Sequence, residues 1–210
     1  MKNKPGKLFV LSGPSGSGKT TLLKHLLRAK GLKGELVQSV SLTTRPKRSG
    51  EREAKDYFFV TERGFRQRQA AQKILEWTKY LGYYYATPKD TVGKYLKAGK
   101  HIGLCLDLKG ALKVKRLYPK SAVTLFILPP SLKALEKRIE KRCHKTKKEE
   151  VVQRLRLARK ELAACRTYDY WLVNKNLSKS IKALTGIVLK EIKKQKEEAD
   201  DTCSYRKPFG

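Results

Sequence analysis

The chain has 210 residues, which suits one core domain with inserted lobes. Its hydrophobic content of 40% excludes global disorder, and its formal net charge of +30 predicts attraction to anions such as nucleotides, nucleic acid or anionic surfaces. The four cysteines and three histidines match no zinc-binding spacing, and no apolar run is long enough for a signal peptide or a membrane span, so a reduced cytoplasmic protein is expected.

The first elements of the chain predict an α/β nucleotide-binding fold. Residues 8–11 (LFVL) form a short apolar run that ends in Ser12-Gly13, which indicates a buried strand followed by a turn. Residues 20–28 place their leucines on one face of a helix. A strand, a glycine turn and a helix in this order open the α/β nucleotide-binding folds.

The segment from residue 36 to residue 90 has a different pattern. Short β-prone pieces at residues 36–41, 57–60 and 83–85 alternate with turns and polar loops, and one helical piece lies at about residues 63–73. This pattern predicts a small β-rich lobe inserted into the α/β domain.

The alternation of strand and helix resumes at Thr91. Further strands are predicted at residues 102–107, 122–128 and 170–173. Further helices are predicted at residues 108–117, 131–142, 150–164 and 177–194. Residues 143–149 are polar and predict an exposed loop, and residues 197–210 lack periodicity and predict a flexible tail.

The strongest motif is the glycine-rich stretch between the first strand and the first helix. It fits G-x-x-x-x-G-K-[ST] and consists of Gly13, Pro14, Ser15, Gly16, Ser17, Gly18, Lys19 and Thr20. In such a loop the backbone N–H groups wrap the phosphates, Lys19 reaches the β- and γ-phosphates, and the hydroxyl of Thr20 ligates Mg²⁺. The motif predicts binding of a nucleoside triphosphate with magnesium, but it does not distinguish a kinase from an ATPase, a GTPase or a motor.

A second cluster predicts an acceptor phosphate site. Arg45 and Arg48 lie three residues apart with a proline between them, and guanidinium forks bind phosphate bidentately. The hydroxyl groups of Ser41 and Tyr57 can donate to the same oxygens. Surface charge explains the arginines equally well at this point.

Farther along the chain, Glu76 and Thr87 predict a base-recognition site. A carboxylate accepts paired N–H bonds from N1 and N2 of guanine, and a hydroxyl can meet O6, whereas adenine lacks the donor pair. The tyrosines at 83–85 add aromatic faces, with core packing of the lobe as the alternative.

These blocks, in this order, resemble guanylate kinase from about residue 6 to residue 194. The resemblance rests on LFVLSGPSGSGKTTL, SVSLTTRPKRSGE, LEW, YYATP, LDLKGA and YDYWLVN, among other blocks. It implies a P-loop core of parallel sheet and helices at residues 1–35, 91–132 and 165–196, a GMP-binding lobe at 36–90, and a helical LID at 133–164. Two departures from the family pattern are Cys105, where an acidic residue is usual, and Ala86, where glycine is usual.

The resemblance also implies a role for individual residues. The GMP phosphate would be held by Ser41, Arg45, Arg48, Tyr57 and Tyr85. The guanine would be bound by Glu76 and Thr87, with Asp107 nearby. The transferring phosphates would be contacted by Lys19, Arg138, Arg142 and Arg154. The ATP would be held by the glycine-rich loop with Thr21 and Asn174.

The implied reaction is direct phosphoryl transfer from ATP to GMP with Mg²⁺, giving ADP and GDP. Three alternatives remain open: a protein-interaction relative without ATP binding, a nucleic-acid-binding protein suggested by the charge, and a P-loop kinase with another acceptor. The intact glycine-rich loop argues against the first. No nucleic-acid motif appears, so contact with nucleic acid is expected to be weak and non-specific, and no membrane contact is expected. The oligomeric state stays open.

Overall fold

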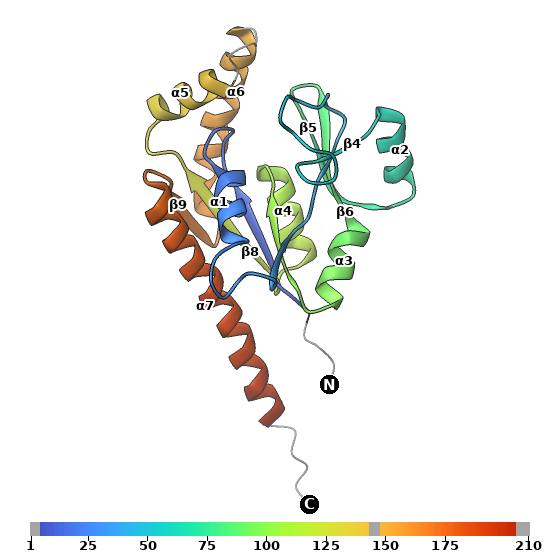
Figure 1. The fold of residues 1–210 in the computed structure, drawn as a ribbon, viewed down its shortest axis with the longest axis vertical. Helices are drawn as coiled ribbons and strands as arrows, with labels where there is room; N and C mark the ends of the chain where they lie inside the picture. The colour runs from blue at the N-terminus through green and yellow to red at the C-terminus, as the bar shows by residue number, and fades with distance from the viewer. Residues whose placement is uncertain (1–4, 143–147, 205–210) are drawn as a thin grey trace, which may run out of the picture.

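The computed structural model of the chain describes residues 5–142 and 148–204, and it has an α/β core (Figure 1). In this described part, five parallel strands form the core sheet. In spatial order they are β2 (Leu36–Gln38), β7 (His101–Cys105), β1 (Leu8–Ser12), β8 (Ala122–Leu128) and β9 (Tyr170–Val173). The central strand β1 is buried at every position, as expected for a parallel strand covered on both faces.

Helices cover both faces of this sheet (Figure 1). They are α1 (Lys19–Leu26), α3 (Lys89–Lys97), α4 (Leu108–Leu117) and α7 (Leu177–Ser204). Because side chains alternate along a strand, Leu8 and Val10 of β1 pack into the apolar cluster on the α3 and α4 side, whereas Phe9 and Leu11 pack into the cluster on the α1 and α7 side. The sheet therefore holds the ends of its strands in fixed positions.

A second, smaller sheet forms the inserted lobe. Its strands in the described residues are β4 (Phe58–Phe59), β3 (Leu42–Thr43), β6 (Tyr83–Pro88) and β5 (Ile74–Tyr80). Helix α2 (Glu62–Ala70) covers it and buries Phe65 against Leu42 and Ala86. Leu81 and Gly82 join β5 to β6 in a two-residue turn, and both have positive φ, at 49° and 86°.

Two helices, α5 (Leu132–Arg142) and α6 (Lys148–Ala163), lie together at one end of the core sheet (Figure 1). Helix α5 packs on α6 through Leu135, Ile139 and Ala158. A short 3-10 turn, η1 (Cys165–Thr167), leads from α6 to β9. This pair occupies the segment that the resemblance assigns to the LID, and residues 143–147 of the predicted loop lie outside the described residues.

The predicted fold class is confirmed, but two predicted elements differ in detail and two observed elements were not predicted. Residues 36–41 are not one strand: the chain leaves the core sheet after β2 and enters the lobe sheet at β3, so residues 36–38 belong to the core sheet. The helix expected at 63–73 ends at Ala70, because Gln72 adopts a positive φ of 54°. Neither β5 nor α3 was expected as a separate element.

The last helix is longer than predicted. Helix α7 was expected to end near Lys194, but it continues to Ser204, and no glycine or proline interrupts residues 195–204. Residues 205–210 lie outside the described part of the chain. None of the helices in the described residues is both long and apolar enough to cross a membrane.

Candidate active site

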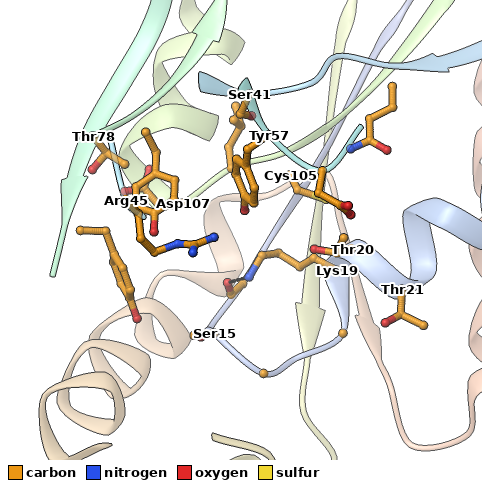
Figure 2. Close-up of a pocket in the computed structure, with 18 of the residues that line it drawn as sticks. Ser15, Lys19, Thr20, Thr21, Ser41, Arg45, Tyr57, Thr78, Cys105 and Asp107 are labelled. Carbon is orange, nitrogen blue, oxygen red and sulfur yellow. Dashed lines mark hydrogen bonds between the residues drawn. The ribbon is translucent and has the colours of Figure 1, made fainter. Parts of the chain in front are cut away.

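A cleft of about 550 Å³ lies where the glycine-rich loop, the lobe sheet and helix α6 meet. We call it the central cleft. The loop contributes Lys19, the lobe contributes Arg45 and Glu76, and α6 contributes Arg154. Figure 2 shows Lys19 and Arg45 extending toward each other across it from opposite walls. Two facing cations favour the binding of anions between them.

The loop between β1 and α1, called here the cradle, depends on its glycines. Gly13 has φ 127°, and a Cβ there would lie 2.4 Å from the carbonyl oxygen of Ile127. Gly18 has φ 98° and caps α1, and its Cβ would lie 2.4 Å from Nδ2 of Asn174. Both positions therefore require glycine. The arrangement directs the N-terminal N–H groups of α1 toward the cleft, where they favour an anion.

Lys19 is the first residue of α1, and its ammonium group donates to the carbonyl oxygens of Gly13 and Pro14, at 2.5 and 3.0 Å. Behind the cradle, the buried Asn174 donates from Nδ2 to the carbonyl oxygen of Ser17 at 2.8 Å. Asn174 thus supports the cradle directly. Its expected contact with ATP stays a prediction.

Oxygen ligands for magnesium gather beside the cradle. The hydroxyl of Thr20 and the carboxylates of Asp107 and Glu161 line the central cleft, and hard oxygen ligands suit Mg²⁺. Cys105 lies beside Thr20 (Figure 2), and burial raises the pKa of its thiol to about 11, so the thiol is neutral. No cluster of three His, Cys, Asp or Glu side chains that could hold a metal ion occurs in the described residues.

The lobe presents an ordered guanidinium fork. Arg45 is buried, and its Nη2 donates to both carboxylate oxygens of Glu51, at 2.7 and 2.9 Å. The backbone N–H of Arg48 donates to the same carboxylate at 2.9 Å. Partial burial disfavours the ionised carboxylate, but these hydrogen bonds outweigh burial and lower the pKa of Glu51. Glu51 therefore holds the loop in shape, a role that the sequence interpretation missed.

Glu76 and Thr87 face each other across the β5–β6 pairing, as the predicted base site requires. Thr87 Oγ1 donates to Glu76 Oε1 at 2.5 Å, and Glu76 is only 3% exposed. Burial is the main cause that raises the pKa of Glu76 to about 7; the hydrogen bond from Thr87 opposes the rise, and repulsion from Asp107 adds to it. Because burial makes ionisation of this carboxyl group unfavourable, its position fits a binding role better than a packing role.

Asp107 occupies the start of α4. Its Oδ1 accepts a hydrogen bond from the N–H of Gly110 at 2.8 Å and so caps the helix. A Cβ at Gly110 would lie 2.5 Å from Glu76 Oε2. Glycine at this position therefore lets the helix approach the carboxyl group of the base site.

The predicted LID arginines lie in different places. Arg154 is 6% exposed and donates from Nη1 to Ser15 Oγ at 3.1 Å, which brings it to the cradle. Arg138 donates from Nη2 to the carbonyl oxygen of Asn174 at 3.2 Å, behind the cradle. Arg142 ends α5, and its side chain lies outside the described part. The cleft lining thus includes Arg154 and excludes Arg138.

The structure brings most predicted residues into one cleft. The lining includes Gly13, Ser15, Gly16, Gly18, Lys19, Thr20, Thr21, Ser41, Arg45, Arg48, Tyr57, Glu76, Tyr85, Asp107 and Arg154. Thr87 and Ser17 are fully buried behind this surface. Several lining residues were missed, among them Tyr80 and Glu161. Burial raises the pKa of Glu161 to about 7 against the effect of Lys19, and no local motif signals either residue.

Comparisons with known proteins agree with this geometry. The family model described as guanylate kinase matches residues 5–191. The chain is 39% identical to the guanylate kinase of Caldanaerobacter subterraneus, with 90% of this chain and 89% of the relative covered. It is 41% identical to the guanylate kinase of Wolbachia pipientis, with 92% and 94% covered. A crystal structure of guanylate kinase from Anaplasma phagocytophilum is 30% identical, with a TM-score of 0.74 and 90% and 87% of the two chains covered.

Proposed function

The chain belongs to the guanylate kinase family and is an ATP:GMP phosphotransferase, and we propose that it transfers the phosphoryl group directly, with magnesium, through the residues of the central cleft. One observation carries this mechanism. The cradle and the arginine loop of the lobe face each other across a single cleft, with Lys19 and Arg45 directed inward (Figure 2). Two anion sites on opposite walls suit a donor and an acceptor phosphate.

On the donor side, the cradle and α1 bind the phosphates of ATP. Lys19 exchanges the carbonyl oxygens of Gly13 and Pro14 for the β- and γ-phosphates. Thr20 and the nucleotide phosphates would hold a magnesium ion, which would supply positive charge that offsets charge on the transferring group. Asp107 and Glu161 line the same cleft and would hold water around the ion.

On the acceptor side, Arg45 and Arg48 bind the GMP phosphate with the hydroxyl groups of Ser41 and Tyr57. The fork of Arg45 is already ordered by Glu51, so little side-chain freedom is lost on binding. Glu76 accepts the N–H donors of guanine in its ionised form. These assignments follow from the shared cleft and the donor and acceptor chemistry of each side chain.

Phosphoryl transfer needs positioned phosphates and offset charge, and it needs no covalent intermediate on the protein. The GMP phosphate oxygen is the nucleophile and already carries charge, so we assign no general base. Arg154, held beside Ser15 above the cradle, stabilises charge that develops on the transferring group. We place the protein in the cytoplasm, and the free thiols of Cys105 and Cys165 agree with a reducing compartment.

A panel of acceptors tests this function. Purified protein is given ATP, Mg²⁺ and one of GMP, AMP, CMP or UMP, and ADP formation is followed in a coupled assay. We expect turnover with GMP at least about a hundredfold above the other acceptors, because they lack the paired N–H donors that Glu76 accepts. Lys19→Ala should abolish turnover while the protein stays folded by circular dichroism. Better turnover with another acceptor, or near-normal turnover of the Lys19 variant, contradicts the proposal.

A further inference from the structure

A row of three tyrosine rings connects the acceptor arginine to the LID arginine. We call Tyr57, Tyr85 and Tyr80 the aromatic row. Tyr57 and Tyr85 have ring centroids 6.0 Å apart, and Tyr85 and Tyr80 have theirs 6.5 Å apart, both edge to face. Cζ of Arg45 lies 5.6 Å from the ring centroid of Tyr57, and Cζ of Arg154 lies 5.7 Å from that of Tyr80. The row therefore ends in a guanidinium group on each side.

Tyr80 owes its place to strand β5. Side chains alternate along a strand, so Glu76, Thr78 and Tyr80 share one face, and all three line the central cleft. The intervening Trp77 and Lys79 are exposed. The tight turn after Tyr80 fixes the end of the strand. The ring is therefore attached to the same rigid strand that carries the base-recognition carboxyl.

Arg154 is held from two sides. Its Nη1 donates to Ser15 of the cradle at 3.1 Å, and Tyr80 of the lobe faces its guanidinium group. The side chain is 6% exposed, and a tyrosine face attracts a guanidinium group most strongly where water is excluded. Tyr80 thus contacts α6 from the lobe, across the central cleft.

We propose that Tyr80 is a positioning residue, whose ring holds the guanidinium group of Arg154 above the cradle. This inference rests on the proposed role of Arg154 at the transferring phosphoryl group. The aromatic row extends this effect to the acceptor site, because Tyr57 and Tyr85 adjoin the arginine that binds the GMP phosphate. Occupation of the acceptor site then steadies Tyr80 and, through it, Arg154. The acceptor lobe in this way contributes to the catalytic arrangement of the LID.

Steady-state kinetics of three variants test the positioning role. Tyr80→Val removes the ring with a side chain that suits a strand, Tyr80→Phe keeps the ring, and Tyr83→Val is the matched control, because Tyr83 lies opposite Tyr80 in the hairpin and is exposed. We expect kcat to fall about tenfold in Tyr80→Val, with KM for ATP and GMP changed less than about twofold. Tyr83→Val should stay within about twofold of the parent protein. Tyr80→Phe keeps the ring but loses the hydroxyl that hydrogen-bonds to Ser15, so it should lose less than about threefold in kcat.

A double-mutant cycle tests whether Tyr80 acts through Arg154. In an Arg154→Ala background, Tyr80→Val should cause no further loss of kcat. Additive losses overturn the proposal, as do unchanged kcat in Tyr80→Val, an equal loss in Tyr80→Phe, or an effect on KM alone. Tyr80→Leu serves as a second ring-free variant if Tyr80→Val unfolds at the assay temperature.

A measurement that does not depend on turnover separates this inference from the proposed function. The Nε–H signal of Arg154 can be identified in the proton–nitrogen NMR spectrum by its disappearance in Arg154→Lys. We expect this signal to shift in Tyr80→Val, because the ring current of Tyr80 is lost. In Tyr83→Val the signal should not move. An unshifted signal in Tyr80→Val overturns the contact. If the parent protein does not phosphorylate GMP, that result contradicts the proposed function and not this contact.

Discussion

The buried carboxyl group of Glu76 lowers the stability of the folded protein when it is ionised, and the ionised form is the one that the proposed guanine contact requires. Its carboxyl group is buried among a hydroxyl and a second carboxylate, and its pKa is raised to about 7 from 4.5. In the proposed role of Glu76 the ionised form accepts guanine N–H donors, yet it is the form that burial disfavours. Bound guanine supplies the missing partners, so GMP should lower this pKa and favour the ionised group.

The pH dependence of stability tests this account. A carboxyl whose pKa is higher in the folded protein stabilises it fully below the unfolded value of 4.5 and loses that contribution as the pH rises to about 7. Glu76→Gln carries no such group, so without nucleotide it should be more stable than the parent at pH 8, by about 3 kcal/mol, with the difference vanishing toward pH 4. Thermal unfolding across this range measures it.

The same variant supplies a functional control. Glu76→Gln should raise KM for GMP at least about a hundredfold and leave ATP binding almost unchanged, because only the base contact is lost. An equal loss for both nucleotides would show that Glu76 does not read the base. If the difference in stability between Glu76→Gln and the parent protein does not change with pH, burial does not raise the pKa of Glu76.

Among the secondary-structure elements, the β5–β6 hairpin matters most for the site, because it carries Glu76, Tyr80, Tyr85 and Thr87. Its turn is not ideal. A two-residue turn with positive φ at both positions favours Asn-Gly, whereas here the first position is Leu81, with φ 49°. The leucine is strained there, since side chains other than asparagine, aspartate and glycine rarely adopt this conformation.

Replacing the turn residue should relieve this strain. Leu81→Asn should stabilise the protein by about 1 kcal/mol, which corresponds to a rise in melting temperature of about 2–4 °C for a chain of this size. Leu81→Val should lower the melting temperature, because a β-branched residue tolerates positive φ poorly. Differential scanning calorimetry of both variants checks the pair. A lower melting temperature for Leu81→Asn would indicate that packing of the leucine outweighs the strain.

The elements that could be predicted are those with local signals. The cradle and the apolar strands β1 and β8 follow from motif and hydrophobic runs, and the fold class follows from their order. The sequence did not reveal β5, because Ile74–Tyr80 mixes charged, aromatic and apolar residues. Tyr80 and Glu161 were missed because their partners, Arg154 and Lys19, lie on other elements and only folding brings them together. Glu51 was missed although its partners Arg45 and Arg48 lie in the same loop, because no motif assigns it a role.

Over the entire chain, the dominant feature is the net charge of +30, of which the cleft uses only a few residues. The other lysines and arginines produce a positive electrostatic field that attracts any polyanion. Such attraction involves no base contacts, so it is insensitive to sequence and weakens steeply with salt. Nucleic acid should therefore compete with the nucleotides only at low ionic strength.

Inhibition by random single-stranded DNA tests this last point. At low salt the DNA should raise KM for both ATP and GMP without lowering kcat, because it competes for the approach to a cationic cleft, and the effect should disappear at about 200 mM salt. Oligonucleotides of different sequence should inhibit equally, and a neutral polymer of similar size serves as the control. Inhibition that persists at high salt, or that depends on base sequence, would instead point to a dedicated nucleic-acid site on this surface.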